Sequence, residues 1–211
     1  MELKFEQVTP AEIERRSFEI IESELPHPLD PQLSPIIKRV IHTTADFSYA
    51  DSLCFSPDAL TSALQAFREG ACIVTDTNMA KAGINKPTLA RHNGEVRCFM
   101  ADEDVRLAAK EQGTTRAAAS MEKACAIERP LIFAIGNAPT ALVKLHELIA
   151  ADRVHPRLII GVPVGFVNVV QAKELIMTSP VPYIVARGRK GGSNVAAAIC
   201  NALLYLLGRE I

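Results

Sequence analysis

Residues 182–207 read PYIVARGRKGGSNVAAAICNALLYLL. This stretch predicts an apolar strand from Pro182 to Ala186, a turn, and an apolar helix from Val195 to Leu207. The turn carries three cations and three glycines. Glycine permits positive φ and close backbone approach, and the free N–H groups at a helix start favour an anion. The turn is therefore either an anion-binding site or a tight connection whose cations are solvated.

Four β-rich runs upstream are each followed in the same way by a turn and a helix-compatible stretch. Strands that alternate with helices imply right-handed crossovers and a parallel sheet, and continuous apolar strands fit a sheet covered on both faces. We therefore expect an α/β fold, a three-layer α/β/α sandwich with a five-stranded, mostly parallel sheet. The expected strands are Cys72 to Thr75, Val96 to Phe99, Leu131 to Ile135, Leu158 to Val162 and Tyr183 to Ala186.

The N-terminal third of the chain is typical of helices instead. Thr9, Pro10 and Glu12 form a helix-start signal, with an N-cap, a first-turn proline and a glutamate three residues after the cap. A second helix is expected near Gln32 to Asp46, where apolar residues recur at helical spacing. A third helix is expected to open at Ser56-Pro57 and to end near Gly70.

Composition limits the protein to an ordinary globular class. Hydrophobic residues make up 48% of the 211-residue chain and charged residues 22%, with no internal repeat or long linker. We therefore expect one domain over residues 1–211, with a helical part at about 1–70 and a parallel-sheet part at about 71–211. The net charge of −1 argues against nucleic-acid binding, which needs a basic surface.

The cysteines and the apolar runs indicate in which cellular compartment the protein is expected. The chain has five cysteines, and no pair lies at CxxC spacing, so we expect reduced core residues rather than disulfides or metal ligands. The first residues are not typical of a signal peptide. The longest apolar runs, Leu158 to Val170 and Val195 to Leu207, are too short to span a bilayer. We expect a cytoplasmic protein without a membrane partner.

The common catalytic motifs are missing. The sequence contains no P-loop, no GxGxxG between a strand and a helix, no GxSxG elbow and no HExxH, and its histidines do not pair at a metal-ligand spacing. We expect no metal site. In a parallel sheet, ligands bind outside the carboxyl ends of the strands, and those ends are rich here in small and polar residues. That composition fits a crevice, although ordinary turns share it.

Two polar residues of the helical part, His42 and Ser17, have either a structural or a functional role. His42 falls opposite the apolar stripe of its helix, on a face that is either solvated or lines a cavity or a partner subunit. A histidine there could exchange protons near neutral pH, with Asp46 at i+4 close enough to bias its protonation. Ser17 lies within the stripe of Ile13, Ile20 and Ile21. Its hydroxyl needs a partner, either the carbonyl four residues earlier or a ligand.

The chain resembles the precorrin-8X methylmutases, called cobalt-precorrin-8 methylmutases in the anaerobic route to cobalamin. The resemblance runs over nearly the whole chain and rests on six segments in matching order and spacing. These segments are Ile13–Phe18 (IERRSF), Val40–Asp46 (VIHTTAD), Val74–Met79 (VTDTNM), Ala134–Leu142 (AIGNAPTAL), Gly161–Val167 (GVPVGFV) and Arg187–Asn194 (RGRKGGSN).

This resemblance implies a flavodoxin-like sandwich that works as a homodimer. It implies an isomerase that moves a methyl group from carbon C11 to carbon C12 of the precorrin macrocycle by a formal 1,5-sigmatropic shift, without a redox or methyl-donor cofactor. The product has the cobyrinic acid skeleton, with or without cobalt. The catalytic histidine of the family falls on His42, thought to act as a general acid, and a substrate-contacting helix residue falls on Ser17.

The expected substrate is a large, flat, mostly apolar ring with a rim of carboxylates. Such a ring needs a wide crevice, rim cations and a proton donor, and an intramolecular migration needs no nucleophile. Arg187, Arg189 and Lys190 suit the carboxylates, and Arg116 is a further candidate that could reach across a dimer. The substrate-binding residues expected on these grounds are Arg16, Ser17, Thr75, Asn78, Arg116, Asn137, Arg187, Lys190, Gly191, Gly192 and Ser193.

Two other functions stay open from the residues alone. A non-catalytic corrinoid carrier on the same fold would need the crevice but not His42. A nucleotide- or phosphate-dependent α/β enzyme would use the turn from Gly188 to Asn194.

Overall fold

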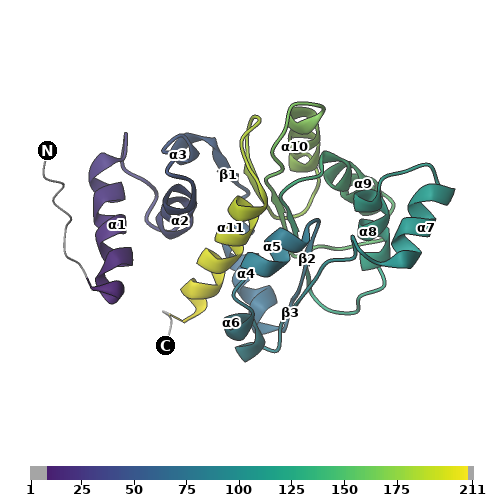
Figure 1. Cartoon of the computed structure of the whole chain (residues 1–211), viewed down its shortest axis with the longest axis horizontal. Helices are drawn as coiled ribbons and strands as arrows, with labels where there is room; N and C mark the ends of the chain where they lie inside the picture. Colours follow the sequence, from purple (N-terminus) through teal and green to yellow (C-terminus); the bar gives the residue numbers. More distant parts are fainter. Residues whose placement is uncertain (1–8, 209–211) are drawn as a thin grey trace, which may run out of the picture.

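The computed structural model describes residues 9–208. A six-stranded sheet lies at the centre and helices cover both of its faces (Figure 1). The strands are β1 (Leu53–Phe55), β2 (Cys72–Thr75), β3 (Glu95–Arg97), β4 (Leu131–Ile135), β5 (Leu158–Gly161) and β6 (Tyr183–Ala186). The helices are α1 (Pro10–Glu24), α2 (Ser34–Thr44), α3 (Tyr49–Ser52), α4 (Ala59–Arg68), α5 (Asn78–Gly83), α6 (Lys86–Arg91), α7 (Glu103–Glu111), α8 (Arg116–Ala124), α9 (Pro139–Ala150), α10 (Val169–Met177) and α11 (Ser193–Leu207).

The order of the strands is β1-β6-β5-β4-β2-β3, and all neighbours are parallel except β1, which pairs antiparallel with β6. Numbered among themselves along the chain, the five parallel strands run 2-1-3-4-5, which is the flavodoxin-like order. The expected sandwich is therefore confirmed, but the sheet has six strands and not five. The missed strand β1 has only three residues, too few for a period to appear, and it interrupts the part of the chain expected to be helical.

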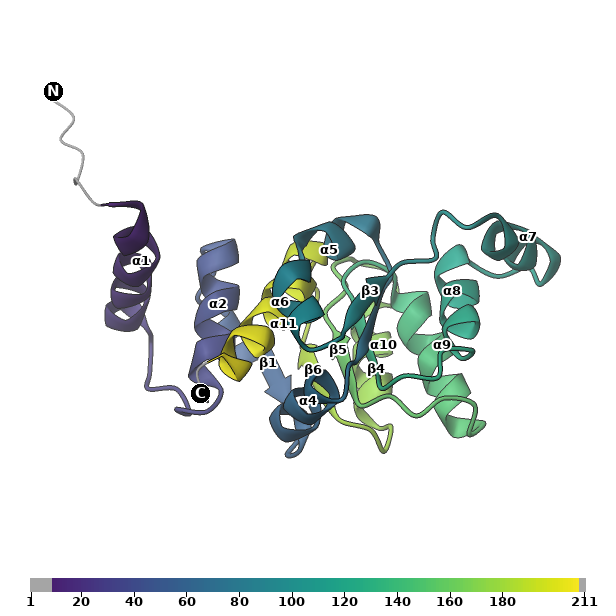
Figure 2. The same cartoon turned by 90° about the horizontal axis from the view of Figure 1, so that it is seen from below.

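Alternate residues of the central strands point into two separate cores. On β4, Ile132 and Ala134 face the core formed with α2, α4, α5, α6 and α11, whereas Leu131, Phe133 and Ile135 face the core formed with α7, α8, α9 and α10. This two-residue alternation of wholly apolar side chains is why the strand reads as a continuous hydrophobic run. Figure 2 shows the two helical layers on either side of the sheet.

Helix α1 lies at one end of the molecule and packs mainly on α2 (Figures 1 and 2). The Glu12 carboxylate caps its start, because it accepts from the Thr9 N–H at 3.2 Å and from the Thr9 hydroxyl at 2.6 Å. The apolar stripe of α1 is only partly buried: Ile21 is 7% exposed, but Ile13 is 50% and Ile20 is 40% exposed. Much of this apolar stripe therefore faces outward.

Three of the five cysteines lie in the core, and Cys54 and Cys125 are half-buried. All five are unpaired, and Cys72, Cys98 and Cys200 are buried. Within residues 9–208 the structure contains no helix that is long and apolar enough to cross a membrane.

Candidate active site

A buried carboxylate organises the carboxyl edge of the sheet at the point where the strand order reverses, between β2 and β4. Asp76 follows β2 and is fully buried. Its oxygens accept from the N–H groups of Gly136 at 2.9 Å, Asn137 at 2.8 Å and Ala138 at 2.6 Å, all in the turn after β4. Burial raises the pKa of the Asp76 carboxyl above its usual range, and the three backbone donors act against that rise.

The turn after β4 also touches the start of α11. A side chain at Gly136 would place its first carbon 2.7 Å from the Ser193 Cα and 2.8 Å from the Gly192 oxygen, so only glycine fits there. The Ser193 hydroxyl lies 2.7 Å from the hydroxyl of Thr77, which caps α5. The ends of β2 and β4 and the start of α11 therefore form one packed unit.

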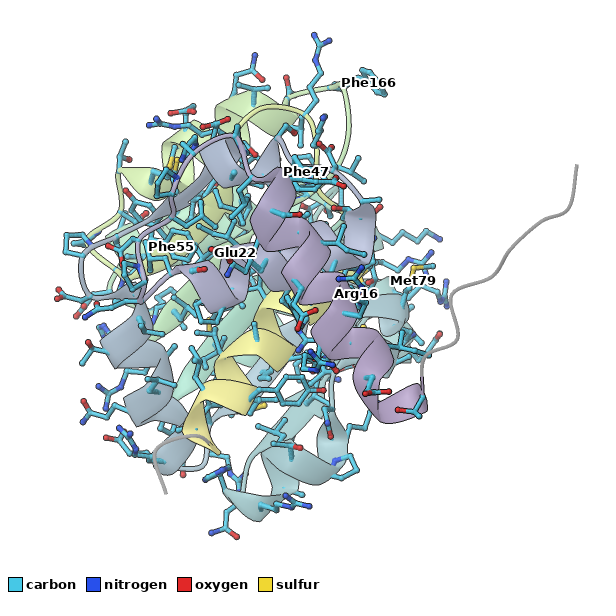
Figure 3. The ribbon with its side chains drawn as sticks, turned by 90° about the vertical axis from the view of Figure 1, so that its left-hand side faces the viewer. Arg16, Glu22, Phe47, Phe55, Met79 and Phe166 are labelled. Atoms are coloured by element: carbon cyan, nitrogen blue, oxygen red, sulfur yellow. The ribbon has the colours of Figure 1, made fainter. Side chains whose placement is uncertain are left out.

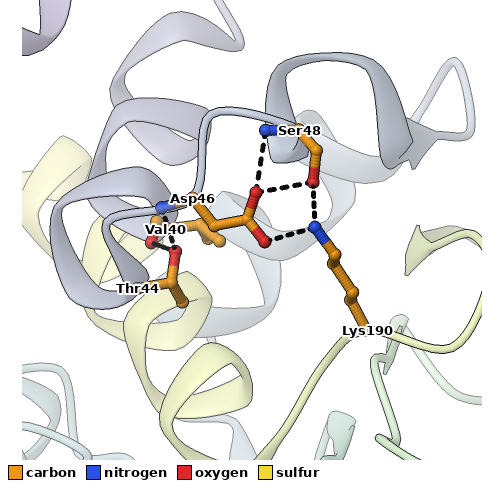
Figure 4. Close-up of polar contacts among 5 residues, drawn as sticks. All are labelled: Val40, Thr44, Asp46, Ser48 and Lys190. Atoms are coloured by element: carbon orange, nitrogen blue, oxygen red, sulfur yellow. Dashed lines mark hydrogen bonds and ion pairs between the residues drawn. The ribbon is translucent and has the colours of Figure 1, made fainter.

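The basic turn, defined as residues 187–192, joins β6 to α11. Lys190 Nζ donates to Asp46 Oδ2 at 2.6 Å and to Ser48 Oγ at 2.9 Å, both in the segment after α2 (Figure 4). This ammonium lowers the pKa of the Asp46 carboxyl. Arg187 Nε lies 3.4 Å from the Glu174 carboxylate, and both arginine and glutamate are largely exposed. Two of the three cations of the turn therefore have a carboxylate partner within the chain.

The carboxylate of Asp46, which was expected to lie close to His42, has Lys190 and Ser48 as its hydrogen-bond partners. Helix α2 ends at Thr44, and Ala45 adopts a left-handed conformation with φ 52°. The chain therefore leaves the helical path before Asp46, whose carboxylate bonds to Lys190 and to Ser48. A spacing of four residues brings side chains together only while the helix continues.

His42 lies in the last turn of α2 and is exposed, opposite the buried residues Ile37, Val40 and Ile41. The ring of Phe18 on α1 stacks against the imidazole, with a centroid distance of 5.5 Å and an interplanar angle of 27°. The guanidinium carbon of Arg39 lies 4.9 Å from the centroid of the same Phe18 ring. The expected polar face of α2 is thus partly covered by α1, with the imidazole left open to solvent.

Other expected substrate-binding residues fall into two groups. The Ser17 hydroxyl donates to the carbonyl of Ile13 at 2.8 Å, which is the local alternative considered for it. Thr75 is fully buried, and its hydroxyl donates to the carbonyl of Thr77 at 3.0 Å and lies 3.3 Å from that of Arg97. Both hydroxyls donate to main-chain carbonyls, and Thr75 is too deeply buried to contact a ligand.

The second group is accessible at the carboxyl edge. Asn78 begins α5 and Asn137 follows β4, and both are exposed. Arg116 is the exposed first residue of α8, beside Thr115, whose hydroxyl lies 2.9 Å from that of Thr140 at the start of α9. Arg16 is exposed on α1, with Glu19 at 3.6 Å. Asn78, Asn137 and Arg116 therefore lie around this edge, whereas Arg16 lies on α1 at one end of the molecule.

Apolar side chains project beside this edge. Phe166 is 82%, Val167 79% and Met79 72% exposed, and the Arg189 guanidinium carbon lies 5.6 Å from the centroid of the Phe166 ring. Figure 3 shows Phe166, Met79 and Arg16 on one side of the molecule. Phe166 and Val167 are neighbours in the chain, and exposed apolar side chains of this kind are candidates for contact with an apolar ligand.

A groove of about 650 Å³ runs between α1, α2 and α11. Its walls carry mixed charge and two aromatic rings, with the Arg39 guanidinium carbon 5.2 Å from the ring centroid of Tyr205. Among residues 9–208, no group of three or more histidine, cysteine, aspartate or glutamate side chains is arranged to hold a metal ion.

The family model described as Precorrin-8X methylmutase matches residues 12–206. The chain belongs to this family. It is 48% identical over 205 residues to the cobalt-precorrin-8 methylmutase of Salmonella typhimurium, covering 94% of this chain and 96% of the relative. It is 39% identical over 194 residues to the precorrin-8X methylmutase of Pseudomonas aeruginosa, with 90% and 93% covered. A solved precorrin-8x methyl mutase from Thermus thermophilus matches with a TM-score of 0.85 and 38% identity, over 94% and 98% of the two chains.

Sequence reasoning missed three features of this methylmutase site. The role of Asp76 depends on a turn 60 residues further along the chain, so no local pattern could reveal it. Phe18 stood inside a segment used for the resemblance, but its contact with His42 joins two helices. The exposure of Phe166 and its neighbours became visible only with the loop in place, because apolar residues after a strand are usually buried.

Proposed function

We propose that this chain moves a methyl group from carbon C11 to carbon C12 of precorrin-8, or of its cobalt form, to give the cobyrinic acid skeleton in cobalamin biosynthesis. The observation that carries the proposal is the family match over residues 12–206, together with relatives named as methylmutases that cover nearly the whole chain. A corrinoid carrier and a nucleotide-dependent enzyme find no support among these names. We place the enzyme in the cytoplasm.

His42 is the proposed general acid. A proton delivered to the conjugated macrocycle lowers the barrier to migration, and a histidine can deliver one near neutral pH. His42 supports this role because it is exposed, and because a stacked aromatic ring restrains its orientation. The methyl group never leaves the substrate, so the reaction needs no nucleophile from the protein. The protein instead supplies a proton, holds the substrate in one orientation and excludes water.

The carboxyl edge supplies matching binding groups. The apolar side chains of Met79, Phe166 and Val167 suit the face of a macrocycle, while Arg187 and Arg189 suit its rim carboxylates. Binding through Lys190 would require its ammonium to be shared with, or taken from, Asp46. Asn78, Asn137, Arg116 and the start of α11 complete the proposed rim, whereas Thr75 supports the fold beneath it.

The enzyme is proposed to act as a homodimer. Ile13 and Ile20 are exposed on α1, the groove of about 650 Å³ beneath that helix is open, and His42 faces solvent in the single chain. A second subunit that covered these features would shield His42 from bulk water, which strengthens electrostatic interactions in the site. A specific interface should bury at least about 1,000 Å² in total. Sedimentation at micromolar concentration tests the assembly.

Incubation of the purified protein with precorrin-8 and, separately, with cobalt-precorrin-8 tests the function. Conversion of either macrocycle, followed by its absorbance spectrum and by mass spectrometry at unchanged mass, is the expected result. Tight binding of both macrocycles without conversion would identify a carrier instead. A protein that neither binds nor converts them would refute both interpretations.

A further inference from the structure

Lys173 on α10 is a fully buried lysine. Its ammonium donates to two main-chain carbonyls of the basic turn, those of Gly188 at 2.9 Å and of Lys190 at 2.8 Å. Within residues 9–208, no carboxylate forms an ion pair with it. The ammonium is therefore compensated by the basic turn alone.

Such a group is unusual because burial disfavours the charged form of a lysine. Burial lowers the pKa of Lys173 to about 8, so the side chain is still largely protonated at neutral pH. An apolar side chain of the same length would fill the space without this desolvation cost. The hydrogen bonds to the two carbonyls of the turn offset part of this cost.

The two hydrogen bonds fix the direction of two peptide groups. Every peptide bond in residues 9–208 is trans, so a carbonyl and the N–H of the next residue point in opposite directions. With the carbonyls of Gly188 and Lys190 turned inward to Lys173, the N–H groups of Arg189 and Gly191 are turned outward. Neither N–H donates to an acceptor within the described part of the chain.

Other backbone hydrogen bonds also hold the turn, and the first runs from the Arg187 N–H to the Ser52 carbonyl at 2.8 Å. Gly165 donates its N–H to the Arg189 carbonyl at 3.1 Å, and Gly192 donates to the Val162 carbonyl at 2.9 Å. A side chain at Gly191 would overlap with the Val162 carbonyl, so the backbone is pressed against the end of β5. Lys173 adds two side-chain hydrogen bonds to these contacts, at Gly188 and Lys190 on either side of Arg189.

We propose that Lys173 is a positioning residue that turns the Arg189 and Gly191 N–H groups of the basic turn outward to bind a carboxylate of the substrate. Two outward N–H groups beside exposed arginines can donate to the oxygens of one anion. Lys173 itself touches no ligand, because its side chain is fully buried beneath the turn. The identity of the carboxylate rests on the proposed function, whereas the orientation of the peptides does not.

Replacement of Lys173 by methionine tests the proposal. Lys173→Met keeps the length of the side chain and removes both donors, and Lys86→Met is the matched control, because Lys86 is an exposed lysine that also donates to a main-chain carbonyl, that of Ala82 at 3.3 Å. A crystal structure of Lys173→Met should show the Gly188 and Lys190 carbonyls turned away from position 173. Carbonyls that keep their direction in the variant would overturn the proposal.

Binding and kinetics give a second readout. Lys173→Met should raise KM for the macrocycle and weaken its equilibrium binding about tenfold or more, with little change in kcat, because hydrogen bonds to a charged group are lost. Lys86→Met should match the wild type. Equal affinity in Lys173→Met and the wild type would overturn the proposal. A wild type that binds no macrocycle would overturn the proposed function instead, and the crystal structure of the variant would then decide the role of Lys173.

If Lys173→Met does not fold, heteronuclear NMR of the wild-type protein decides the question. The amide signals of Arg189 and Gly191 should exchange rapidly with solvent in the free protein, because both groups point outward without an acceptor. Both amide protons should move downfield when a corrinoid polycarboxylate is added. Slow exchange of these two amides in the free protein would overturn the proposal.

Discussion

Replacement of Asp76 by asparagine should destabilise the carboxyl edge of the sheet. The carboxylate accepts one N–H at Oδ1 and two at Oδ2, at 2.6 to 2.9 Å. An asparagine has only one acceptor oxygen. Its better orientation places that oxygen toward Asn137 and Ala138, so that its NH₂ group faces the Gly136 N–H and leaves that buried donor without a partner.

The size of the effect follows from these contacts. An unsatisfied buried N–H costs about 1–3 kcal/mol, and the two remaining bonds lose the strength that a charged acceptor gives. Relief of the desolvated charge acts in the opposite direction, as the raised pKa of Asp76 indicates. We expect a net loss of about 2–4 kcal/mol in the free energy of unfolding.

Urea denaturation followed by circular dichroism measures this change. Asp152→Asn is the matched control, because Asp152 is an exposed loop residue whose positive φ suits asparagine equally well. The control should stay within about 0.5 kcal/mol of the wild type. An Asp76→Asn protein as stable as the control would refute the account of the Asp76 cluster.

Three further predictions concern the site. Arg187→Ala should raise KM with little change in kcat, and the difference from the wild type should shrink as salt is added; a lower kcat at unchanged KM would contradict a pure binding role. Phe18→Leu should lower kcat about two- to tenfold, and Phe18→Tyr should restore it, as measured by steady-state turnover, because the stacked ring restrains His42. The folded pKa of Lys173 is about 8, below its usual 10.5, so the unfolded chain binds more protons between these values and stability rises with pH through that window. Urea titrations should give a free energy of unfolding about 3 kcal/mol higher above pH 10 than at neutral pH. The Lys173→Met variant should lack this difference.

Much of the fold was accessible to sequence reasoning because its signals are local. The strands Leu131–Ile135 and Tyr183–Ala186 have the expected bounds, since both are buried on two faces and so form uninterrupted apolar runs. Strand β1 was missed because three residues carry no period, and its pairing partner lies more than a hundred residues away on β6.

The site depends more on contacts between distant segments. The Ser17 hydroxyl found the local partner that helix geometry offers. The partner of Asp46 could not be foreseen, because the helix ends through a left-handed alanine and not through the glycine that usually signals such an end. The same limit applies to Lys173, which appears in the sequence as an ordinary helical lysine and acquires its role only from the turn that folds over it.

The most direct test of the proposed mechanism is single-turnover conversion of precorrin-8 by the wild type and by His42→Ala, with His155→Ala as a control for an exposed histidine elsewhere. The rate in His42→Ala should fall by about 10²–10⁴, as expected for loss of a general acid, while its affinity for the macrocycle and its unfolding curve stay close to those of the wild type. The control should convert the substrate at the wild-type rate. Conversion by His42→Ala at that rate would contradict the account and remove His42 from the chemistry.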